Sequence, residues 1–116
     1  VSDAHLLKQL ANPDFFVLVA LHGPEVIGCM SVYAIHQYYS TRPQAYLYDL
    51  AVTSPQQGKG VGKGLMRYAC VHFAALGYES LYVQAHASDK GAVAFYRATQ
   101  PTEAKSVHHF SYTLSR

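Results

Sequence analysis

A glycine-rich stretch, Gln57 to Gly62, combines residue types and a spacing that suit binding of a phosphate group. It follows a strand-like run that ends at Val52 and precedes a helix-like run over residues 61–76. A turn between a strand and a helix N-terminus directs backbone N–H groups at an anion, and glycine lets the anion come close. The stretch therefore predicts a cradle for a phosphate-bearing ligand.

Two phosphate-binding patterns do not fit this stretch. The Walker A loop needs a glycine where Gln57 stands and a Ser or Thr where Gly64 stands. The dinucleotide pattern Gly-x-Gly-x-x-Gly ends on Lys63 or Leu65. A third pattern, Gln/Arg-x-x-Gly-x-Gly/Ala, fits residues 57–62 without a mismatch. A flexible surface turn with incidental glycines is the alternative.

The elements around the stretch are those of a single α/β domain over residues 1–116. The patterns predict a hairpin turn at His22 to Glu25 and a helix end at Gly77. Ser88 or Asp89 can cap the last helix. The expected helices cover residues 4–11, about 60–76 and about 89–98, and the expected strands cover 15–21, 26–35, 45–53, 80–85 and 106–114.

This order of motifs resembles the GNAT acetyltransferases, whose acyl-coenzyme A loop has the third pattern. More narrowly, the chain is similar to the aminoglycoside 3-N-acetyltransferase branch over roughly residues 5 to 114. The phrases that carry the likeness are Tyr48-Asp49-Leu50-Ala51-Val52, Leu76-Gly77, Tyr82-Val83-Gln84-Ala85, Ala92-Val93-Ala94, Tyr96 and His109-Phe110.

The resemblance implies the GNAT acyl-CoA N-acyltransferase fold, a mixed central sheet with flanking helices. It also implies one strand and one helix before residue 1 that this chain lacks. A missing first strand leaves a sheet edge exposed, and exposed edges invite pairing with another chain. We therefore expect a homodimer.

The resemblance also implies acetyl-CoA as cosubstrate. In the family, the strand before the loop bulges, and its freed backbone groups, here those of Leu50 and Val52, pair with the pantetheine arm. The N–H of Leu50 would face the thioester oxygen. The expected coenzyme-binding residues are Leu50, Ala51, Val52, Gln57, Gly58, Lys59, Gly60, Val61, Gly62, Asp89 and Tyr96.

Three side chains are candidates for the proton transfers, because direct attack of an amine on a thioester needs a base and an acid but no serine or cysteine nucleophile. The resemblance places Tyr96 at the general acid, and the alternative is a core tyrosine. Asp49 is a candidate base, or a structural carboxylate, and His109 on the last strand is a second candidate base. Strict alternation puts Tyr46 and Tyr48 on one face and Asp49 on the other, although a bulge can re-aim one of them.

We expect an N-acetyltransferase that acts on a primary amine of a small molecule, with aminoglycoside-like amines among the candidates. The alternatives are a protein or peptide amine acetyltransferase and a catalytically silent acyl-CoA-binding module. The acceptor is open because Gln44 stands where the family usually has an acid, and each lost carboxylate weakens attraction for a polycation. Many tyrosines near the expected cleft suit an aromatic or moderately polar amine equally well.

Composition excludes several other classes of function. A net charge of +2 is too small to indicate nucleic-acid binding. The seven histidines lack metal-ligand spacing, so we expect no metal. No apolar run approaches a membrane span, and no signal peptide is recognisable, so we expect a cytoplasmic protein with no membrane partner. Cys29 and Cys70 do not form a disulfide framework, and we expect both thiols to be buried.

Overall fold

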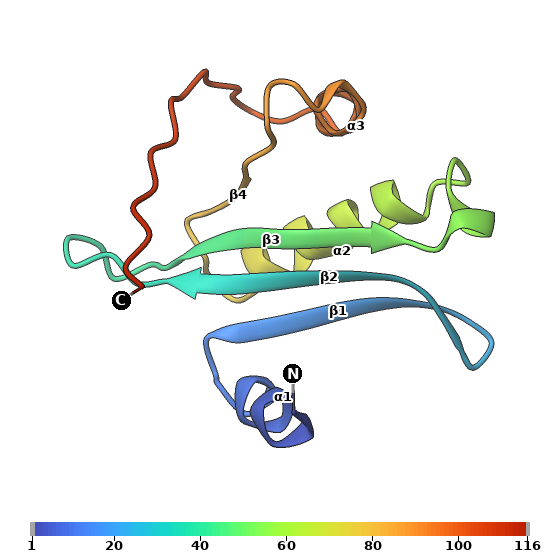
Figure 1. Ribbon diagram of the computed structural model, residues 1–116, viewed down its shortest axis with the longest axis horizontal. Coiled ribbons are helices and arrows are strands. Elements are labelled where there is room, and N and C mark those ends of the chain that lie inside the picture. Colours follow the sequence, from blue (N-terminus) through green and yellow to red (C-terminus); the bar gives the residue numbers. More distant parts are fainter. Residues whose placement is uncertain (1, 116) are drawn as a thin grey trace. The chain divides into compact units, whose positions relative to one another are not determined.

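The computed structural model describes residues 2–115, which form two compact units. The first unit extends to Ala85 and the second begins at His86. In the first unit the elements are α1 (Asp3–Leu10), β1 (Phe15–His22), β2 (Glu25–Ile35), β3 (Gln44–Val52), the 3-10 turn η1 (Ser54–Gln56), α2 (Val61–Ala75) and β4 (Ser80–Val83). The second unit contains α3 (Lys90–Ala98) (Figure 1).

The four strands form one mixed sheet in the order β1-β2-β3-β4. Strands β1, β2 and β3 are antiparallel neighbours joined by short turns, whereas β4 lies parallel to β3. Helix α2 makes the crossover between the two parallel strands, as a parallel connection requires. The mixed sheet with flanking helices confirms the predicted fold class, and β1 is an edge strand.

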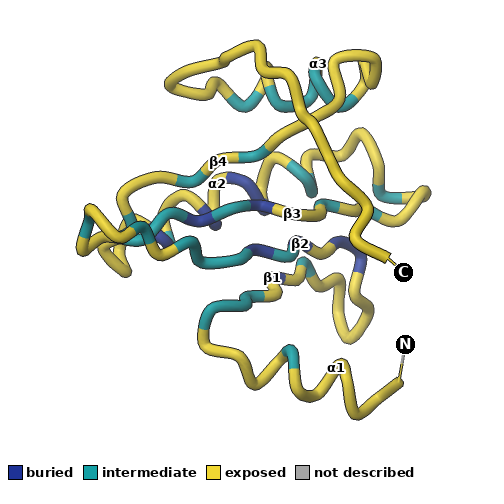
Figure 2. Tube along the Cα trace, turned by 60° about the vertical axis from the view of Figure 1, so that its left-hand side comes forward, coloured by how far each residue is buried: buried dark blue, intermediate teal, exposed yellow. Residues whose placement is uncertain are grey.

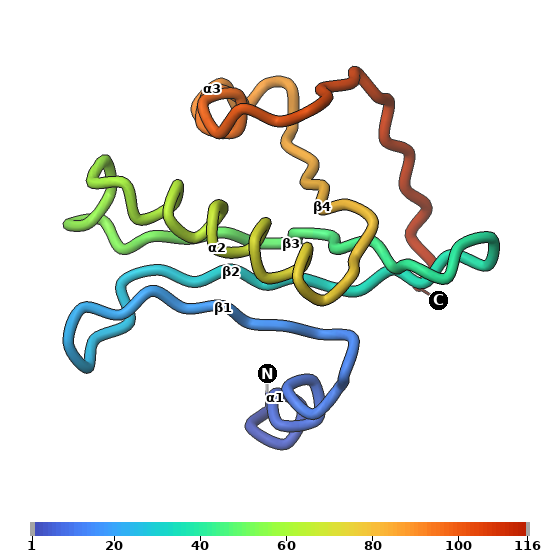
Figure 3. Tube along the Cα trace, turned by 180° about the vertical axis from the view of Figure 1, so that it is seen from behind, coloured from blue at the N-terminus to red at the C-terminus, as the bar shows by residue number. Residues whose placement is uncertain are grey.

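One side of the sheet is covered by α2, and we call it the helix face (Figure 3). Apolar residues three or four apart in α2 form a buried stripe on that helix, as the sequence pattern predicts. Strand residues at alternate positions meet this stripe, so the core lies between α2 and the sheet (Figure 2). The buried residues are Leu18, Ile27, Met30, Val32, Ala45, Leu47, Leu65, Met66, Ala69 and Phe73.

Gly28 lets the start of α2 approach β2 closely. A Cβ atom at this position would lie 3.0 Å from Cγ1 of Val61 and 3.3 Å from Cδ1 of Leu65. Those distances are tight for any side chain, so glycine in the middle of this strand marks a close approach of two elements.

Helix α2 ends where its sequence predicts. The N–H of Gly77 donates to the carbonyl of Ala74, and the N–H of Tyr78 donates to the carbonyl of Phe73 at 3.0 Å. These two bonds form a Schellman motif, and the rings of Phe73 and Tyr78, 5.0 Å apart, supply its hydrophobic contact. Arg42 adds bonds from its guanidinium to the carbonyls of Gly77 and Tyr78, both at 3.3 Å.

Two sequence-based expectations are wrong. Residues 99–115 contain no strand, although residues 106–114 alternate in polarity. A strand requires a hydrogen-bonded neighbour, and within residues 86–115 no second strand exists to pair with it. Val107 and Leu114, two of its apolar residues, are 64% and 91% exposed. Both cysteines are also exposed rather than buried, because Cys29 points away from α2 and Cys70 lies off the buried stripe of that helix.

Candidate active site

A β-bulge interrupts β3 just before its C-terminal half. Ser31 pairs with Asp49, but the next residue of β2, Val32, pairs with Leu47. Tyr48 is therefore an extra residue in β3 with no partner in β2. The insertion reverses the alternation, so that Leu50 after the bulge lies opposite the buried Met30, on the helix face.

The bulge places Asp49 on the opposite side of the sheet, which we call the tyrosine face because Tyr33, Tyr46 and Tyr48 lie there. The ring of Tyr48 is 5.7 Å from that of Tyr33 and 6.0 Å from that of Tyr46, with edge-to-face geometry in both pairs. Asp49 shares the face, because it pairs with Ser31 and accepts a 3.4 Å hydrogen bond from the hydroxyl of Ser31. Strict alternation would have turned Asp49 into the core.

The same bulge marks the point where β3 separates from β4. Pairing between the two parallel strands ends at Leu47 and Val83. The N–H of Thr53 donates to the carbonyl of Ile27 in β2, and alternate residues of a strand direct their backbone groups to alternate edges. The backbone groups of Leu50 and Val52 therefore point to the opposite edge of β3, which no longer pairs with β4.

The glycine-rich turn lies directly after this open edge. Gly60 has φ 87° and serves as the N-cap of α2, a left-handed conformation that favours glycine. No side chain caps the first turn of α2, and no acidic residue lies in it. The first N–H groups of a helix have no partners within the helix, so here they are available to an anion.

Two cations and one amide surround this turn. Lys59 and Lys63 are both exposed at the start of α2 and add positive charge to the helix N-terminus. The side chain of Gln57 donates from its Nε2 to the carbonyl of Val52 at 3.0 Å, which ties the turn to the end of β3. The side chain of Gln57 thus fixes the turn to β3, and its backbone N–H donates to the carbonyl of Ser54 at 3.3 Å.

The other predicted site residues lie in the second unit. Tyr96 is half-buried on α3, its ring is 5.1 Å from that of Phe95, and its carbonyl accepts a bond from the hydroxyl of Thr99. Asp89 caps α3, because its Oδ1 accepts from the N–H of Ala92 at 3.0 Å. His109 lies on an exposed segment without regular structure, not on the strand that was expected to carry it.

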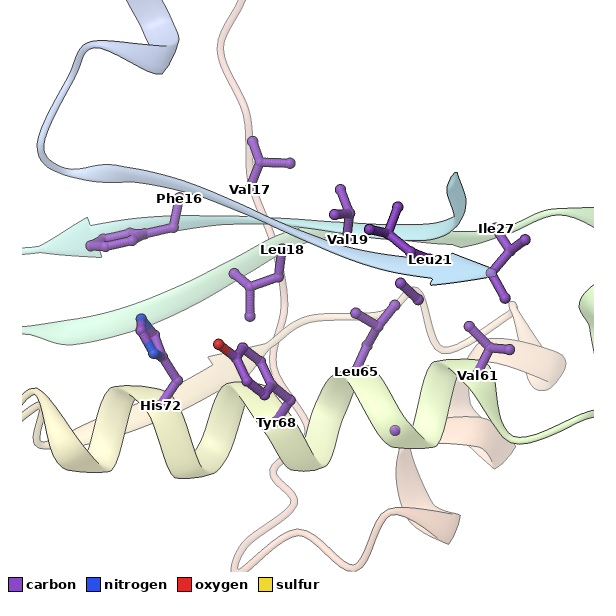
Figure 4. A pocket seen from close by; sticks show the side chains of 12 residues that line it. Phe16, Val17, Leu18, Val19, Leu21, Ile27, Val61, Leu65, Tyr68 and His72 are labelled. Carbon is purple, nitrogen blue, oxygen red and sulfur yellow. The ribbon is translucent and has the colours of Figure 1, made fainter. Parts of the chain in front are cut away.

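A groove with a volume of about 700 Å³ lies on the helix side of β1. Figure 4 shows Leu18 of β1 pointing toward Leu65 and Tyr68 of α2, while Val17 points away. The lining is apolar apart from Tyr68 and His72, and it contains no carboxylate or lysine. It therefore differs from the bulge and the turn, where Asp49, Lys59 and Lys63 lie.

Between residues 2 and 115 no three His, Cys, Asp or Glu side chains are grouped so that they could hold a metal ion. None of the helices described here has both the length and the apolar composition needed to cross a bilayer.

The resemblance predicted a bulge in the strand before the turn but not its position, and the sequence reasoning gave no role to Gly28. Only the pairing with β2 identifies Tyr48 as the inserted residue. The sequence contains one weak indication of this insertion. The alternation of polar and apolar residues breaks after Leu47, because the polar residues Tyr48 and Asp49 are adjacent. Gly28, an isolated glycine within a strand-like run, could have been recognised as a close approach.

The sequence pattern of the acetyltransferase (GNAT) family matches residues 2–99. Among solved structures, an aminoglycoside acetyltransferase from an uncultured soil metagenomic sample, in complex with trehalose, is 41% identical with a TM-score of 0.96. The match covers 99% of this chain and 76% of that one. The same protein in complex with sisomicin is 40% identical, with the same TM-score and the same coverage.

Two rat proteins are more distant relatives. N-acetyltransferase 8F1 of Rattus norvegicus is 27% identical over 93 residues, which are 80% of this chain and 42% of the rat protein. N-acetyltransferase 8B of the same organism is 31% identical over 78 residues, which are 67% of this chain and 35% of the rat protein. The chain thus spans less than half the length of either rat relative.

Proposed function

Because the chain belongs to the GNAT acetyltransferase family, we propose that it transfers the acetyl group of acetyl-CoA to a primary amine of a small molecule. The observation that carries the proposal is the bulge at Tyr48, which puts Asp49 beside the part of β3 that no longer pairs with β4 and ahead of the glycine-rich turn. A base, a row of backbone donors and an anion cradle then follow one another along fourteen residues, 49–62.

The glycine-rich turn would hold the pyrophosphate of the coenzyme. The uncapped N–H groups at the start of α2 and the positive end of its dipole would bind the anion, and Lys59 and Lys63 would add attraction. The N–H groups of Leu50 and Val52 and the carbonyl of Leu50 would bind the extended arm of the coenzyme as a neighbouring strand would, while the carbonyl of Val52 accepts from Gln57. The residues present therefore fit this cosubstrate.

Asp49 would accept the proton that the amine loses as its nitrogen attacks the thioester carbon. The outward N–H of Leu50 would stabilise the oxyanion as the new C–N bond forms. Tyr96 would donate its phenolic proton to the sulfur when the C–S bond breaks, and the products would be an amide and a free thiol. His109 is the second candidate for the base.

The acceptor would be a small-molecule amine. The relative that is 41% identical is an aminoglycoside acetyltransferase, and it has been solved with sisomicin bound. That likeness supports aminoglycosides as the first amines to try. We also propose that the protein is cytoplasmic and forms a homodimer; a monomer in sedimentation experiments at working concentrations would contradict the dimer.

The first experiment is calorimetric titration of acetyl-CoA into the purified chain and into two matched glycine variants. Gly62→Val adds a branched side chain at the second position of α2, in the cradle, and we expect it to abolish micromolar binding. Gly64→Val adds the same side chain one half-turn later, at an exposed position where a Cβ meets no atom within 4 Å, and we expect binding to persist. Equal binding by the two variants would contradict the cradle.

The second experiment measures acceptor-dependent thiol release. Tyr96→Phe removes the proposed acid, so we expect turnover to fall more than acetyl-CoA binding does. Unchanged turnover would refute the role of Tyr96. If a folded chain binds acetyl-CoA but releases no thiol with small amines or with lysine peptides, the protein is a silent acyl-CoA-binding module. Release with lysine peptides alone would identify a protein acetyltransferase.

A further inference from the structure

An aromatic row crosses the tyrosine face from one edge of the sheet to the other. Phe15 of β1 pairs in register with Tyr33 of β2, Tyr33 pairs with Tyr46 of β3, and Tyr46 pairs with Tyr82 of β4. The rings of Phe15 and Tyr33 lie 4.9 Å apart, and those of Tyr46 and Tyr82 lie 4.9 Å apart and nearly parallel. A row at one register position forms a continuous aromatic surface.

Tyr48, the inserted residue, stands on this row at its middle. Its ring contacts both Tyr33 and Tyr46 edge-on, and its side chain is still 60% exposed. Contacts on two sides hold the ring in place, and exposure leaves its surface free for another ring. Aromatic rings favour offset stacks and edge-to-face contacts with a second ring, and their faces attract cations.

Charge is scarce on this face. Asp49 is the single charged side chain among the strand residues that point to it in the described chain. At the start of β3, the amide of Gln37 donates to Oε1 of Gln44 at 3.0 Å. Two neutral amides therefore occupy this end of the face. The other strand residues on the face are uncharged, and they are Phe15, Val17, Val19, Leu21, Val26, Cys29, Ser31, Tyr33, Ile35, Gln44, Tyr46, Tyr48, Ala51, Ser80 and Tyr82.

One carboxylate can pair with one ammonium group. A polycation placed here would bring several charges to a surface that offers a single partner, and the remaining charges would lose hydration without compensation. The phenol of Tyr82 does not add negative charge near neutral pH, because burial and the neighbouring Tyr46 raise its pKa above the ordinary value of 10.0. The single negative charge of the face thus matches the single positive charge of a monoamine.

We propose that the acceptor is a primary monoamine carried by a ring, with the ring on the surface formed by Tyr33, Tyr46 and Tyr48 and the amine at Asp49. The inference rests on the proposed acetyl transfer and narrows its acceptor. Tyr48 and Asp49 are consecutive, so a ring that contacts the first holds a substituent of two or three bonds within reach of the second.

Three amines separate the two parts of this proposal. 2-Phenylethylamine has one amine and a ring, n-octylamine has the same charge and the same number of carbons without a ring, and sisomicin has rings and several amines. We expect kcat/KM for 2-phenylethylamine to exceed both others about tenfold, in line with the worth of one good aromatic contact.

Tyr48→Leu is the decisive variant. It removes the ring but keeps an apolar side chain, so we expect KM for 2-phenylethylamine to rise about fivefold to tenfold while kcat and the KM for acetyl-CoA hold. Tyr68→Leu is the matched control, since Tyr68 is 58% exposed on α2, and this variant should leave all three constants unchanged.

The outcomes are distinct. A higher kcat/KM for sisomicin, equal values for 2-phenylethylamine and n-octylamine, or an unchanged KM in Tyr48→Leu would overturn the ring-borne monoamine and leave acetyl transfer intact. If no amine releases thiol and calorimetry detects no acetyl-CoA binding, the proposed function and this inference fall together.

Discussion

The helix face and the tyrosine face belong to the same strands, but their residues do different work. Met30 and Leu47 on the helix face are 0% and 1% exposed and contact α2, so their contribution is packing. Tyr33 and Asp49 on the tyrosine face remain accessible and could contact a ligand. The comparison teaches that alternation alone specifies a packed face, whereas the other face acquires its carboxylate only through one inserted residue.

The largest expected effect is on the helix face. Phe73 is 1% exposed and makes ring contacts with Phe16, His72 and Tyr78, so Phe73→Ala should lower the free energy of unfolding by about 3–5 kcal/mol. Tyr33→Ala on the other face should cost clearly less, because its site is already partly open to water. Urea denaturation of both variants measures the difference, and equal losses would erase the distinction between the faces.

The second effect is on the tyrosine face, where we expect a loss of activity rather than of stability. Asp49→Asn should reduce kcat by about 10²- to 10⁴-fold, the usual contribution of a positioned base, and should change stability by less than about 0.5 kcal/mol because the side chain is exposed. Ser31→Ala is the control, since it removes only the 3.4 Å hydrogen bond to the carboxylate. A loss of kcat no greater than in the control would remove Asp49 from the mechanism.

A third, smaller effect links the core to the cradle. Gly28→Ala places a methyl group 3.0 Å from Val61, the first residue of α2, so we expect a loss of stability of about 1–3 kcal/mol and weaker acetyl-CoA binding. Gly64→Ala, where a Cβ meets no atom within 4 Å, should instead gain roughly 0.5–1 kcal/mol. Thermal melts of the two variants measure the change in stability, and calorimetry measures acetyl-CoA binding. Unchanged acetyl-CoA binding by Gly28→Ala would show that the packing of α2 on β2 does not affect the turn.

The smallest effect appears at high pH. Burial raises the pKa of Tyr78, beside the core, above 10.0, and the charge of Asp14 raises it further. The unfolded phenol then ionises first, so this contribution to stability is complete below pH 10 and declines as pH rises through the folded pKa. Tyr78→Phe should flatten the decline in denaturation curves between neutral and alkaline pH; an identical slope in both proteins would argue against it.

Most of the fold could be predicted because its signals are local. The buried stripe of α2, the cap at Asp89 and the helix end at Gly77 each depend on a few neighbouring residues. The wrong strand over residues 106–114 shows the limit: alternation is local, but a strand needs a partner elsewhere.

In the candidate site, too, some features depend on local sequence and others depend on how distant strands pair. The turn at Gln57 to Gly62 follows a fixed spacing, so its place between β3 and α2 could be predicted, and its role as a phosphate cradle stays a prediction. The face on which Asp49 lies depends on how β3 pairs with β2, which no local pattern contains. The role of the side chain of Gln57, bound to Val52, also required coordinates.

The insertion of Tyr48 has a consequence for how the chain tolerates a change in length. Removing this one residue would leave every other side chain of β3 on its present face, because Leu47 and Asp49 would then alternate regularly. The core would be preserved, yet a continuous ladder could form and β3 would no longer be bent away from β4. A deletion is commonly more disruptive than a substitution. Here it would produce a more regular strand β3 and close the gap between β3 and β4.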